Sequence, residues 1–302
     1  MDNQTFDITD DELLDVEKLT LEAIANRSIE GLNVLGFGEI GVPLGWPFDE
    51  PRMCVKRIIS SKSQADIDQM VDGVREYIAG LQPHVEVVPT ELRTIVNEHG
   101  SIVFYLIQPL IPRDELLENV LADTTPTADH PAIVAVRDAS VATAKGRNFS
   151  LDSQFSNFRW KDDKLSFFDV GTPCRLTSAG EAAPLPRVVL LAMPAIVRPI
   201  AHKETLKVFN GLASTRGNLH HAARSLARLG LDGWIRPVVE TFNEVIDHEP
   251  LVADDIRAAM KDLQKDVKSL KNLMRAQRFW SEKVRREPYT FFITDSFTGE
   301  FL

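Results

Sequence analysis

The chain has 302 residues, of which 44% are hydrophobic and 26% are charged. This is the composition of a folded protein long enough for two lobes, so a disordered chain and a fibrous repeat are excluded. The formal net charge of −10 argues against general binding to nucleic acid or to an anionic membrane, because like charges repel. We therefore expect no nucleic-acid partner and no membrane partner.

The sequence shows no sign of export or of a membrane span. Residues 1–11 are acidic, where a signal peptide would be basic and then apolar. The longest apolar run, 188–197, is shorter than the roughly 20 residues needed to cross a bilayer. Cys54 and Cys174 offer neither a disulfide framework nor metal-ligand spacing, so we expect two core thiols in a cytoplasmic protein.

A glycine-rich segment follows a predicted N-terminal helix, which begins at the capping-box spacing of Thr9 and Glu12. The segment has the pattern G-x-G-x-x-G, formed by Gly36, Gly38 and Gly41. A dinucleotide-binding fold would continue into a helix, which the nearby prolines prevent, and a phosphate loop of the Walker type would end in Gly-Lys-Ser/Thr. A glycine-rich turn between two strands remains, and taken alone it could be an ordinary hairpin with bulges.

A strand and a helix are predicted next. The strand covers residues 53–59 and carries Lys56, fifteen residues after the last glycine of the pattern. Residues 63–81 have apolar side chains at helical spacing, and Asp68, Asp72 and Glu76 recur every four residues on a neighbouring face. A solvated acidic stripe accounts for at least two of these three acids.

Three more strands are predicted at 85–88, 92–96 and 102–107, and the last one runs into Gln108 and Leu110. Beyond this point the patterns are helical except for one hairpin, so the sequence predicts an α+β protein. The expected helices cover 114–121, 131–145, 186–200, 203–214, 218–229, 233–247 and 253–286. The apolar stripe of the last helix is typical of a core face, and it would also allow a homodimer.

Two carboxylates and an amide follow the helix at 131–145. Asp152 and Asn157 lie five residues apart among turn formers, and Asp169 stands where a strand breaks into Gly171 and a proline. A hairpin with its turn at 161–164 would bring the three side chains to the same end. Oxygen ligands of this kind suit Mg²⁺, which prefers one or two protein ligands together with substrate phosphates.

This spacing resembles the catalytic and metal-binding loops of the protein-kinase-like superfamily, and is closest in character to the aminoglycoside and choline phosphotransferases. The resemblance implies a bilobal fold, with a small antiparallel-sheet lobe at 1–111 and a larger helical lobe at 112–302. It implies that Asp152 is the base, and that Asn157 and Asp169 are Mg²⁺ ligands. One position departs from the pattern, because Ser150 stands where the family usually has histidine.

The same resemblance implies an ATP site. The turn that contains Gly36, Phe37, Gly38 and Gly41 would cover the phosphates, and Lys56 would contact them as a second catalytic residue. Glu76, or alternatively Asp72, would pair with Lys56. Backbone groups near Gln108 and Leu110 would meet the adenine.

The function that follows is transfer of a phosphoryl group from ATP to a hydroxyl of a small molecule. The segment 172–186 is too short for the long activation loop of a protein kinase, and it is not followed by Ala-Pro-Glu. The alternatives are a protein kinase or AMP transferase using the same residues, and a nucleotide-binding pseudokinase scaffold, which Ser150 favours.

A second motif points weakly to a different function. Residues 215–231 faintly resemble a helix-turn-helix, but their spacing is too long and the chain is acidic, so a DNA-binding regulator is disfavoured. His220 and His221 have no third ligand at zinc spacing, and we expect them at the surface or in an acceptor pocket.

Overall fold

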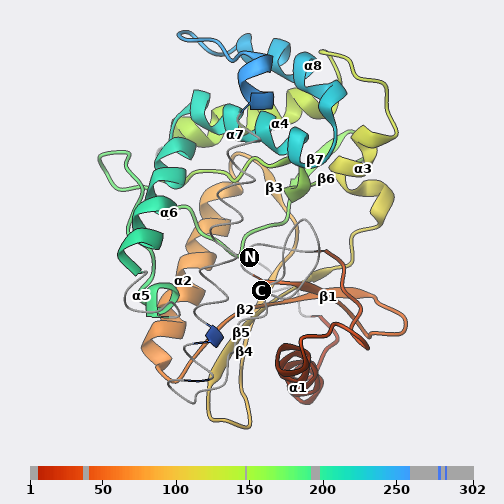
Figure 1. The fold of residues 1–302 in the computed structure, drawn as a ribbon, viewed down its shortest axis with the longest axis vertical. Helices are drawn as coiled ribbons and strands as arrows, with labels where there is room; N and C mark the ends of the chain where they lie inside the picture. Colours follow the sequence, from red (N-terminus) through yellow and green to blue (C-terminus); the bar gives the residue numbers. More distant parts are fainter. Residues whose placement is uncertain are drawn as a thin grey trace.

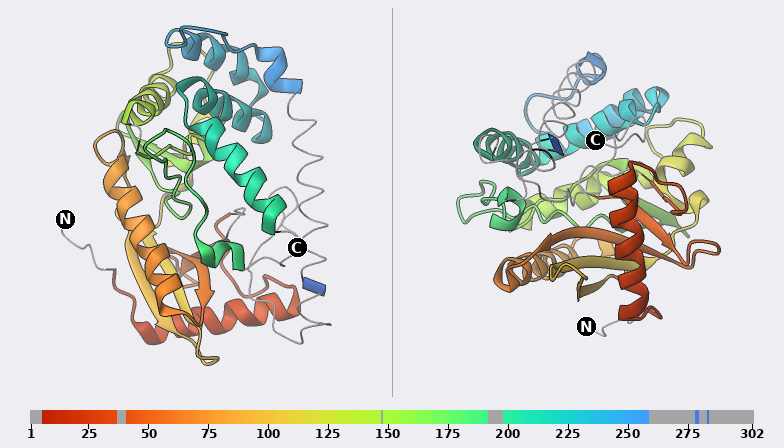
Figure 2. Two further views of the ribbon diagram at one scale, coloured as in Figure 1. Left: turned by 90° about the vertical axis from the view of Figure 1, so that its left-hand side faces the viewer. Right: turned by 60° about the horizontal axis from the view of Figure 1, so that its bottom comes forward.

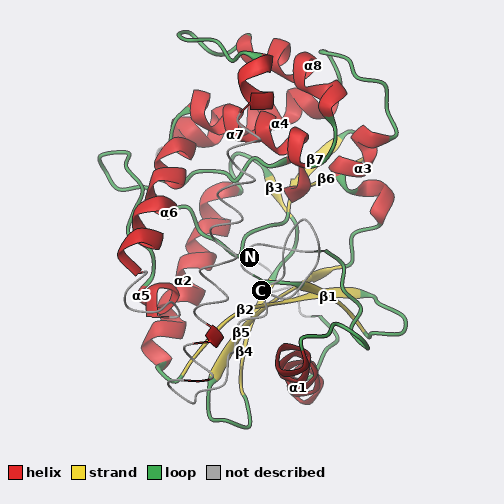
Figure 3. Ribbon diagram, in the orientation of Figure 1, coloured by secondary structure: helices red, strands yellow, loops and turns green. Residues whose placement is uncertain are grey.

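The computed structural model describes residues 6–36, 41–146, 148–191 and 198–258, together with residues 278, 279 and 283. An antiparallel sheet with two helices against it forms the N-terminal part, and a mostly helical part follows (Figure 1). The separation is plain when the ribbon is coloured by secondary structure (Figure 3). The expected α+β class, with an N-terminal antiparallel sheet and a helical C-terminal region, is confirmed.

The N-terminal sheet has the strand order β1-β2-β5-β4, and every neighbouring pair is antiparallel. The strands are β1 Pro43–Trp46, β2 Met53–Ser61, β4 Glu91–Val96 and β5 Ile102–Pro109. Alternate side chains of a strand point to opposite faces of the sheet. In β2 this places Val55 in the core beneath the sheet and directs Lys56 to the other face.

Helix α1 (Asp10–Asn26) covers one face of this sheet, as both views in Figure 2 show. Its start is the predicted capping box, in which Thr9 accepts a hydrogen bond from the Glu12 amide and the Glu12 carboxylate accepts one from the Thr9 amide. Leu13, Val16 and Ile24 are buried and pack with the sheet residues on this face. Apolar burial therefore holds α1 on the sheet.

A buried polar network joins α1 to the sheet. The Glu17 carboxylate accepts hydrogen bonds from Arg57 Nε at 2.7 Å, from the Tyr105 hydroxyl at 2.6 Å and from Asn97 Nδ2 at 3.0 Å. Burial alone would raise the pKa of Glu17, but the charge and hydrogen bonds of Arg57, with those of Tyr105 and Asn97, outweigh it and lower the pKa. Glu17 is thus ionised and satisfied inside the protein.

The opposite face of the sheet packs on α2 (Gln64–Leu81) and on the C-terminal part. The buried face of α2 contains four residues of the predicted apolar face, Ile67, Met70, Val74 and Leu81, and also Tyr77, which was not predicted. A second, three-stranded sheet has the order β3-β7-β6 and is made of β3 Glu86–Val87, β6 Phe158–Lys161 and β7 Lys164–Phe167. Its β6–β7 hairpin turns at Asp162 and Asp163 with φ of 49° and 58°, which confirms the predicted turn.

The remaining helices build the C-terminal part. They are η1 Arg113–Glu115, α3 Leu117–Ala122, α4 Pro131–Gly146, η2 Phe155–Asn157, α5 Arg187–Leu191, α6 Arg198–Leu212, α7 Thr215–Arg228 and α8 Asp232–Asn243. The predicted helix at 253–286 and the tail after it lie almost wholly outside the described residues. None of the helices in the described part of the chain combines the length and the apolarity that a membrane crossing requires.

The buried network leads to a first prediction. Glu17→Gln keeps the shape of the side chain but removes the negative charge beside buried Arg57, so we expect a loss of about 3–5 kcal/mol of unfolding free energy. Urea denaturation measures the loss, and Glu22→Gln, an exposed position on the same helix, should change it by less than about 0.5 kcal/mol.

The loss should depend on pH. The lowered pKa of folded Glu17 stabilises the protein above the unfolded pKa, so the difference between wild type and Glu17→Gln should shrink as the pH falls through the folded pKa. Equal stability of the two proteins at neutral pH would contradict this account of the network.

Candidate functional site

An ion pair links the sheet to the C-terminal part. Lys56 Nζ lies 2.9 Å from Asp169 Oδ1, although the two residues are 113 positions apart in the chain. The Lys56 side chain is 18% exposed and that of Asp169 is 29% exposed, so both can be reached from solvent. A cationic donor and a carboxylate with its second oxygen uncommitted therefore stand together on the face of the sheet opposite α1.

Asp152 and Asn157 join this pair through hydrogen bonds of the backbone. Asn157 Nδ2 donates to the Asp152 carbonyl at 3.2 Å, and the Asn157 carbonyl accepts from the Phe168 amide at 3.1 Å. Phe168 directly precedes Asp169, so the base of the β6–β7 hairpin holds the acid and the amide next to each other. The structure thus brings together the four residues that the sequence motif singled out.

The loop that carries Asp152 is braced by one face of α7. Asn218 Nδ2 donates to the Leu151 carbonyl at 2.6 Å, and Ser225 Oγ accepts from the Phe155 amide at 3.0 Å. Between these contacts, His221 Nε2 lies 3.1 Å from Asp152 Oδ1. Residues three to four apart share a helix face, so α7 contacts this loop along its length.

Ser150 stands at the position where a histidine was expected. It is buried, and it also helps to fix the loop. Its hydroxyl contacts the Leu212 carbonyl, and its own carbonyl accepts a hydrogen bond from the Tyr77 hydroxyl at 2.9 Å. Its amide donates to the Cys174 carbonyl at 2.8 Å. The loop therefore has anchors in α2, in α6 and in the segment after Asp169 as well as in α7.

The surroundings of Asp152 favour its ionised form. Partial burial raises the pKa of the carboxyl, but the hydrogen bond and charge of His221, assisted by Gln154, outweigh burial and lower the pKa overall. Gln154 Nε2 lies 3.1 Å from Asp152 Oδ2, so each carboxylate oxygen has a donor. Because a carboxylate oxygen can accept more than one hydrogen bond, Asp152 can still accept from a ligand.

The prediction that Glu76, or alternatively Asp72, pairs with Lys56 is wrong. Glu76 lies 3.0 Å from Arg175 and both side chains are about half exposed, while Asp72 pairs with Arg75 on the surface of α2. The reason is the orientation of α2, whose buried face directs its acidic residues toward solvent. Lys56 instead pairs with Asp169.

The glycine-rich segment is only partly described. Phe37 and Gly38 lie outside the described residues, whereas Gly36 and Gly41 lie within them. A Cβ atom at Gly41 would come within 2.6 Å of the Arg57 carbonyl oxygen, so only glycine fits this approach to β2. Gly41 also lies beside Lys56, since the same Cβ would be 3.8 Å from Lys56 Cε.

The end of β5 contacts the Asp169 segment through a side chain. Gln108 Nε2 donates to the Phe168 carbonyl at 2.8 Å and to Thr90 Oγ1 at 2.9 Å. The Leu110 amide donates to the Arg52 carbonyl over 3.4 Å. Gln108 therefore fixes the residue before Asp169, and contact of this strand end with adenine stays a prediction.

Neither cysteine is a thiolate at neutral pH. Burial raises the pKa of Cys54 and of Cys174 to about 12, so both thiols are neutral. This agrees with the expectation of core thiols, although Cys54 is only half-buried.

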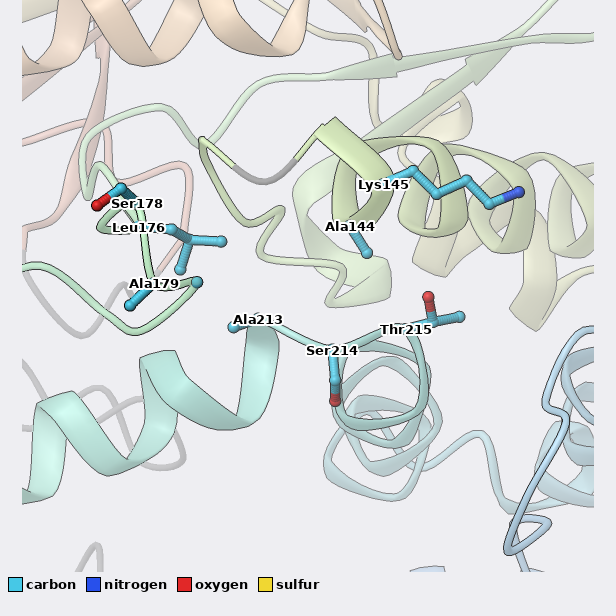
Figure 4. Close-up of a pocket in the computed structure, with 9 residues that line it drawn as sticks. Ala144, Lys145, Leu176, Ser178, Ala179, Ala213, Ser214 and Thr215 are labelled. Atoms are coloured by element: carbon cyan, nitrogen blue, oxygen red, sulfur yellow. The ribbon is translucent and has the colours of Figure 1, made fainter.

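A pocket of about 470 Å³ lies away from these residues, between the end of α4, the loop at 176–180 and the α6–α7 junction (Figure 4). Its side chains are mostly small, and Lys145 extends away from the others. None of the residues predicted for the site lines it. Lys145 is the one ionisable side chain among its lining residues.

A metal ion would need more ligands than the protein supplies here. Within the described ranges, no group of three or more His, Cys, Asp or Glu side chains could hold a metal by itself. Asn157 Oδ1 and Asp169 Oδ2 take no hydrogen bond from any described residue, and both are hard oxygen donors. This pair fits an ion that completes its shell with water and phosphate, as Mg²⁺ does.

The sequence did not identify α7 as the brace of the site. Its contact residues recur at 218, 221, 225 and 228, which is helical spacing, but the residues they contact lie about 70 positions earlier in the chain. The only local signal was a row of polar side chains on one helix face.

Comparison with known proteins adds a family match. A family model described as "Family of unknown function (DUF6206)" matches residues 42–232, which is more than half of the chain. No curated protein matches the sequence significantly. The fold is similar to that in the crystal structure of the M. tuberculosis PknI kinase domain, with 16% identity over 68% of this chain and 73% of that chain. The TM-score is 0.33.

The brace predicts a local effect of mutation. Asn218→Ala leaves the buried Leu151 carbonyl without its donor, so we expect a loss of about 1–3 kcal/mol and faster hydrogen exchange at residues 151–155. Exchange followed by mass spectrometry checks this. Asn243→Ala is the matched control, because Asn243 braces Leu251 in the same way and should loosen only that segment. Unchanged protection at 151–155 would show that Asn218 does not brace the loop.

Proposed function

The chain belongs to the DUF6206 family, whose function is unknown, and we propose that it is an ATP- and Mg²⁺-dependent phosphotransferase acting on a hydroxyl group. The observation that carries the proposal is the convergence of Lys56, Asp152, Asn157 and Asp169. A cation, a partly exposed carboxylate and two uncommitted oxygen donors are the parts that phosphoryl transfer asks of a protein.

Asn157 and Asp169 would hold the metal. Their free oxygen atoms match the preference of Mg²⁺ for few protein ligands and several phosphate or water oxygens. Bound Mg²⁺ would supply neutralising charge for the phosphates. Lys56, which lies beside Asp169, would then donate its ammonium hydrogens to phosphate oxygens rather than to the carboxylate alone.

Asp152 would orient the acceptor and receive its proton. The lowered pKa keeps the carboxylate ionised at neutral pH, so it can accept a hydrogen bond from the attacking hydroxyl. As the hydroxyl oxygen bonds to the γ-phosphorus of ATP and the bond to the leaving ADP oxygen breaks, the hydroxyl proton passes to Asp152. Phosphoryl transfer gains most from such positioning and from charge stabilisation.

The acceptor we favour is a neutral or cationic small molecule. The segment 172–186 between the site and α5 is short, and a bridge between Leu176 and Ala182 folds part of it back on itself. This leaves little chain for docking a protein substrate. Protein phosphorylation and AMP transfer remain the alternatives. The helix predicted at 253–286, most of which lies outside the described residues, would allow a homodimer.

The brace by α7 favours an enzyme over a nucleotide-binding scaffold. Ser150 was the feature that pointed to a scaffold, because a catalytic loop without its histidine would be poorly fixed. Asn218, His221 and Ser225 supply contacts that fix this loop by other means. The substitution at 150 is therefore no argument against catalysis.

Asp152→Asn tests the catalytic role. We expect ATP consumption, measured with a panel of hydroxyl compounds and with water as the acceptor, to fall about 10²–10⁴-fold while calorimetry shows unchanged binding of Mg·ATP. A scaffold would bind Mg·ATP and consume none of it in either protein. Mass spectrometry of the protein after incubation with ATP identifies self-phosphorylation or AMP transfer.

Asp169→Asn tests the nucleotide site. This change removes the metal-binding charge and the partner of Lys56, so the Mg²⁺-dependent part of ATP affinity should be lost. Glu76→Gln is the control, because Glu76 pairs with exposed Arg175 and its loss should leave ATP affinity unchanged. A calorimetric titration with ATP and Mg²⁺ that shows no heat for the wild type would contradict the proposed function.

A further inference from the structure

We propose that His221 is a positioning residue for Asp152, holding its carboxylate in one orientation from the rigid frame of α7. The inference rests on the proposed function and adds a residue to it. His221 is contributed by a helix 69 positions further along the chain. It would act on the reaction only through Asp152.

The contact is direct and lies in a partly buried place. His221 Nε2 is 3.1 Å from Asp152 Oδ1, and the two side chains are 27% and 32% exposed. An ionised carboxylate only accepts hydrogen bonds, so Nε2 must carry the hydrogen and donate it. This holds for the neutral ring and for the charged ring alike.

His221 connects Asp152 to a fixed element. Gln154, the other donor to the carboxylate, belongs to the same irregular loop as Asp152 and moves with it. On α7, Asn218 and Ser225 lie on either side of His221 and contact the loop at Leu151 and Phe155. His221 thus sets the direction of the carboxylate relative to the helix, and helices hold functional groups more accurately than loops do.

The charge around Asp152 agrees with this role. His221 provides the largest effect that lowers its pKa, against burial that raises it. The other titratable groups of this site are Lys56 from β2 and Asp169, which pair with each other, together with Tyr77 from α2 and Cys174 from the segment after Asp169. Burial raises the pKa of Tyr77 and of Cys174, so both are neutral near pH 7. Lys56 contacts Asp169, so His221 is the ring that directly contacts the Asp152 carboxylate.

His220 provides a matched control one residue away. Its titratable neighbours are Arg216, Arg224, His221 and Asp255, and none of the four catalytic and metal-binding residues is among them. Burial and the two arginines lower the pKa of His220. A general effect of removing a histidine from α7 would therefore appear in both variants.

The experiment compares His221→Ala, His221→Gln and His220→Ala in the full chain. The first readout is the pKa of Asp152, followed by NMR of the Mg²⁺-free protein with ¹³C-labelled aspartate, so that no ion bound at Asn157 contributes to the titration. The second is the pH profile of Mg·ATP consumption with water or a hydroxyl compound as acceptor. Both histidines are partly exposed, so we expect all three proteins to fold.

His221→Ala should raise the pKa of Asp152, because the main stabilisation of its charged form is gone. The acidic limb of the profile should move to higher pH, and kcat should fall about 10²-fold with the KM for ATP unchanged. His221→Gln offers an amide donor in place of Nε2 and should recover most of kcat. His220→Ala should match the wild type in both readouts.

The proposal is overturned if His221→Ala leaves the pKa of Asp152 in place, or if His220→Ala causes the same loss of kcat. The titration needs no turnover, so it decides the matter even for a protein that consumes no ATP. Absence of ATP consumption by the wild type would count against the proposed function, and an unchanged Asp152 pKa would count against the role of His221.

Discussion

The hydrogen bonds between α7 and the loop at 150–156 are the constraint on which the site depends. A loop with so little regular structure of its own has no internal ladder of hydrogen bonds, so its shape must come from what it touches. Asn218, His221 and Ser225 meet successive parts of it, and Asn157 ties its end to the β6–β7 hairpin. The acid is therefore presented from a helix and a hairpin.

The strand β2 has a different role on each of its faces. Arg57 is directed to α1, where it donates a hydrogen bond to Glu17. Asn97 and Tyr105 donate to the same buried carboxylate. Its neighbour Lys56 points the opposite way and meets Asp169. Because successive side chains of a strand point to opposite faces, the neighbouring residues Lys56 and Arg57 pair with different carboxylates, those of Asp169 and Glu17. The packing of α1 fixes the strand that positions the lysine.

The parts that sequence patterns predicted are those set by short-range spacing. Asp152, Asn157 and Asp169 lie within eighteen positions of one another, and hairpin geometry was enough to bring them together. The pairing of the acidic residues of α2 could not be predicted in this way. Sequence spacing shows that Glu76 lies on a polar helix face, but it does not show how far that face lies from Lys56. His221 depends on a contact across 69 residues, and no local pattern marks such a contact. Tertiary packing decided both cases.

The buried network around Glu17 also bears on where the folding unit begins. The family match starts at residue 42, whereas α1 ends at Asn26 and supplies the carboxylate that neutralises Arg57. A fragment cut at the start of the matched region would keep the guanidinium but lose its counter-ion, and it would uncover the apolar underside of the sheet. The residues matched by the family model therefore leave out a helix on which the stability of the sheet depends.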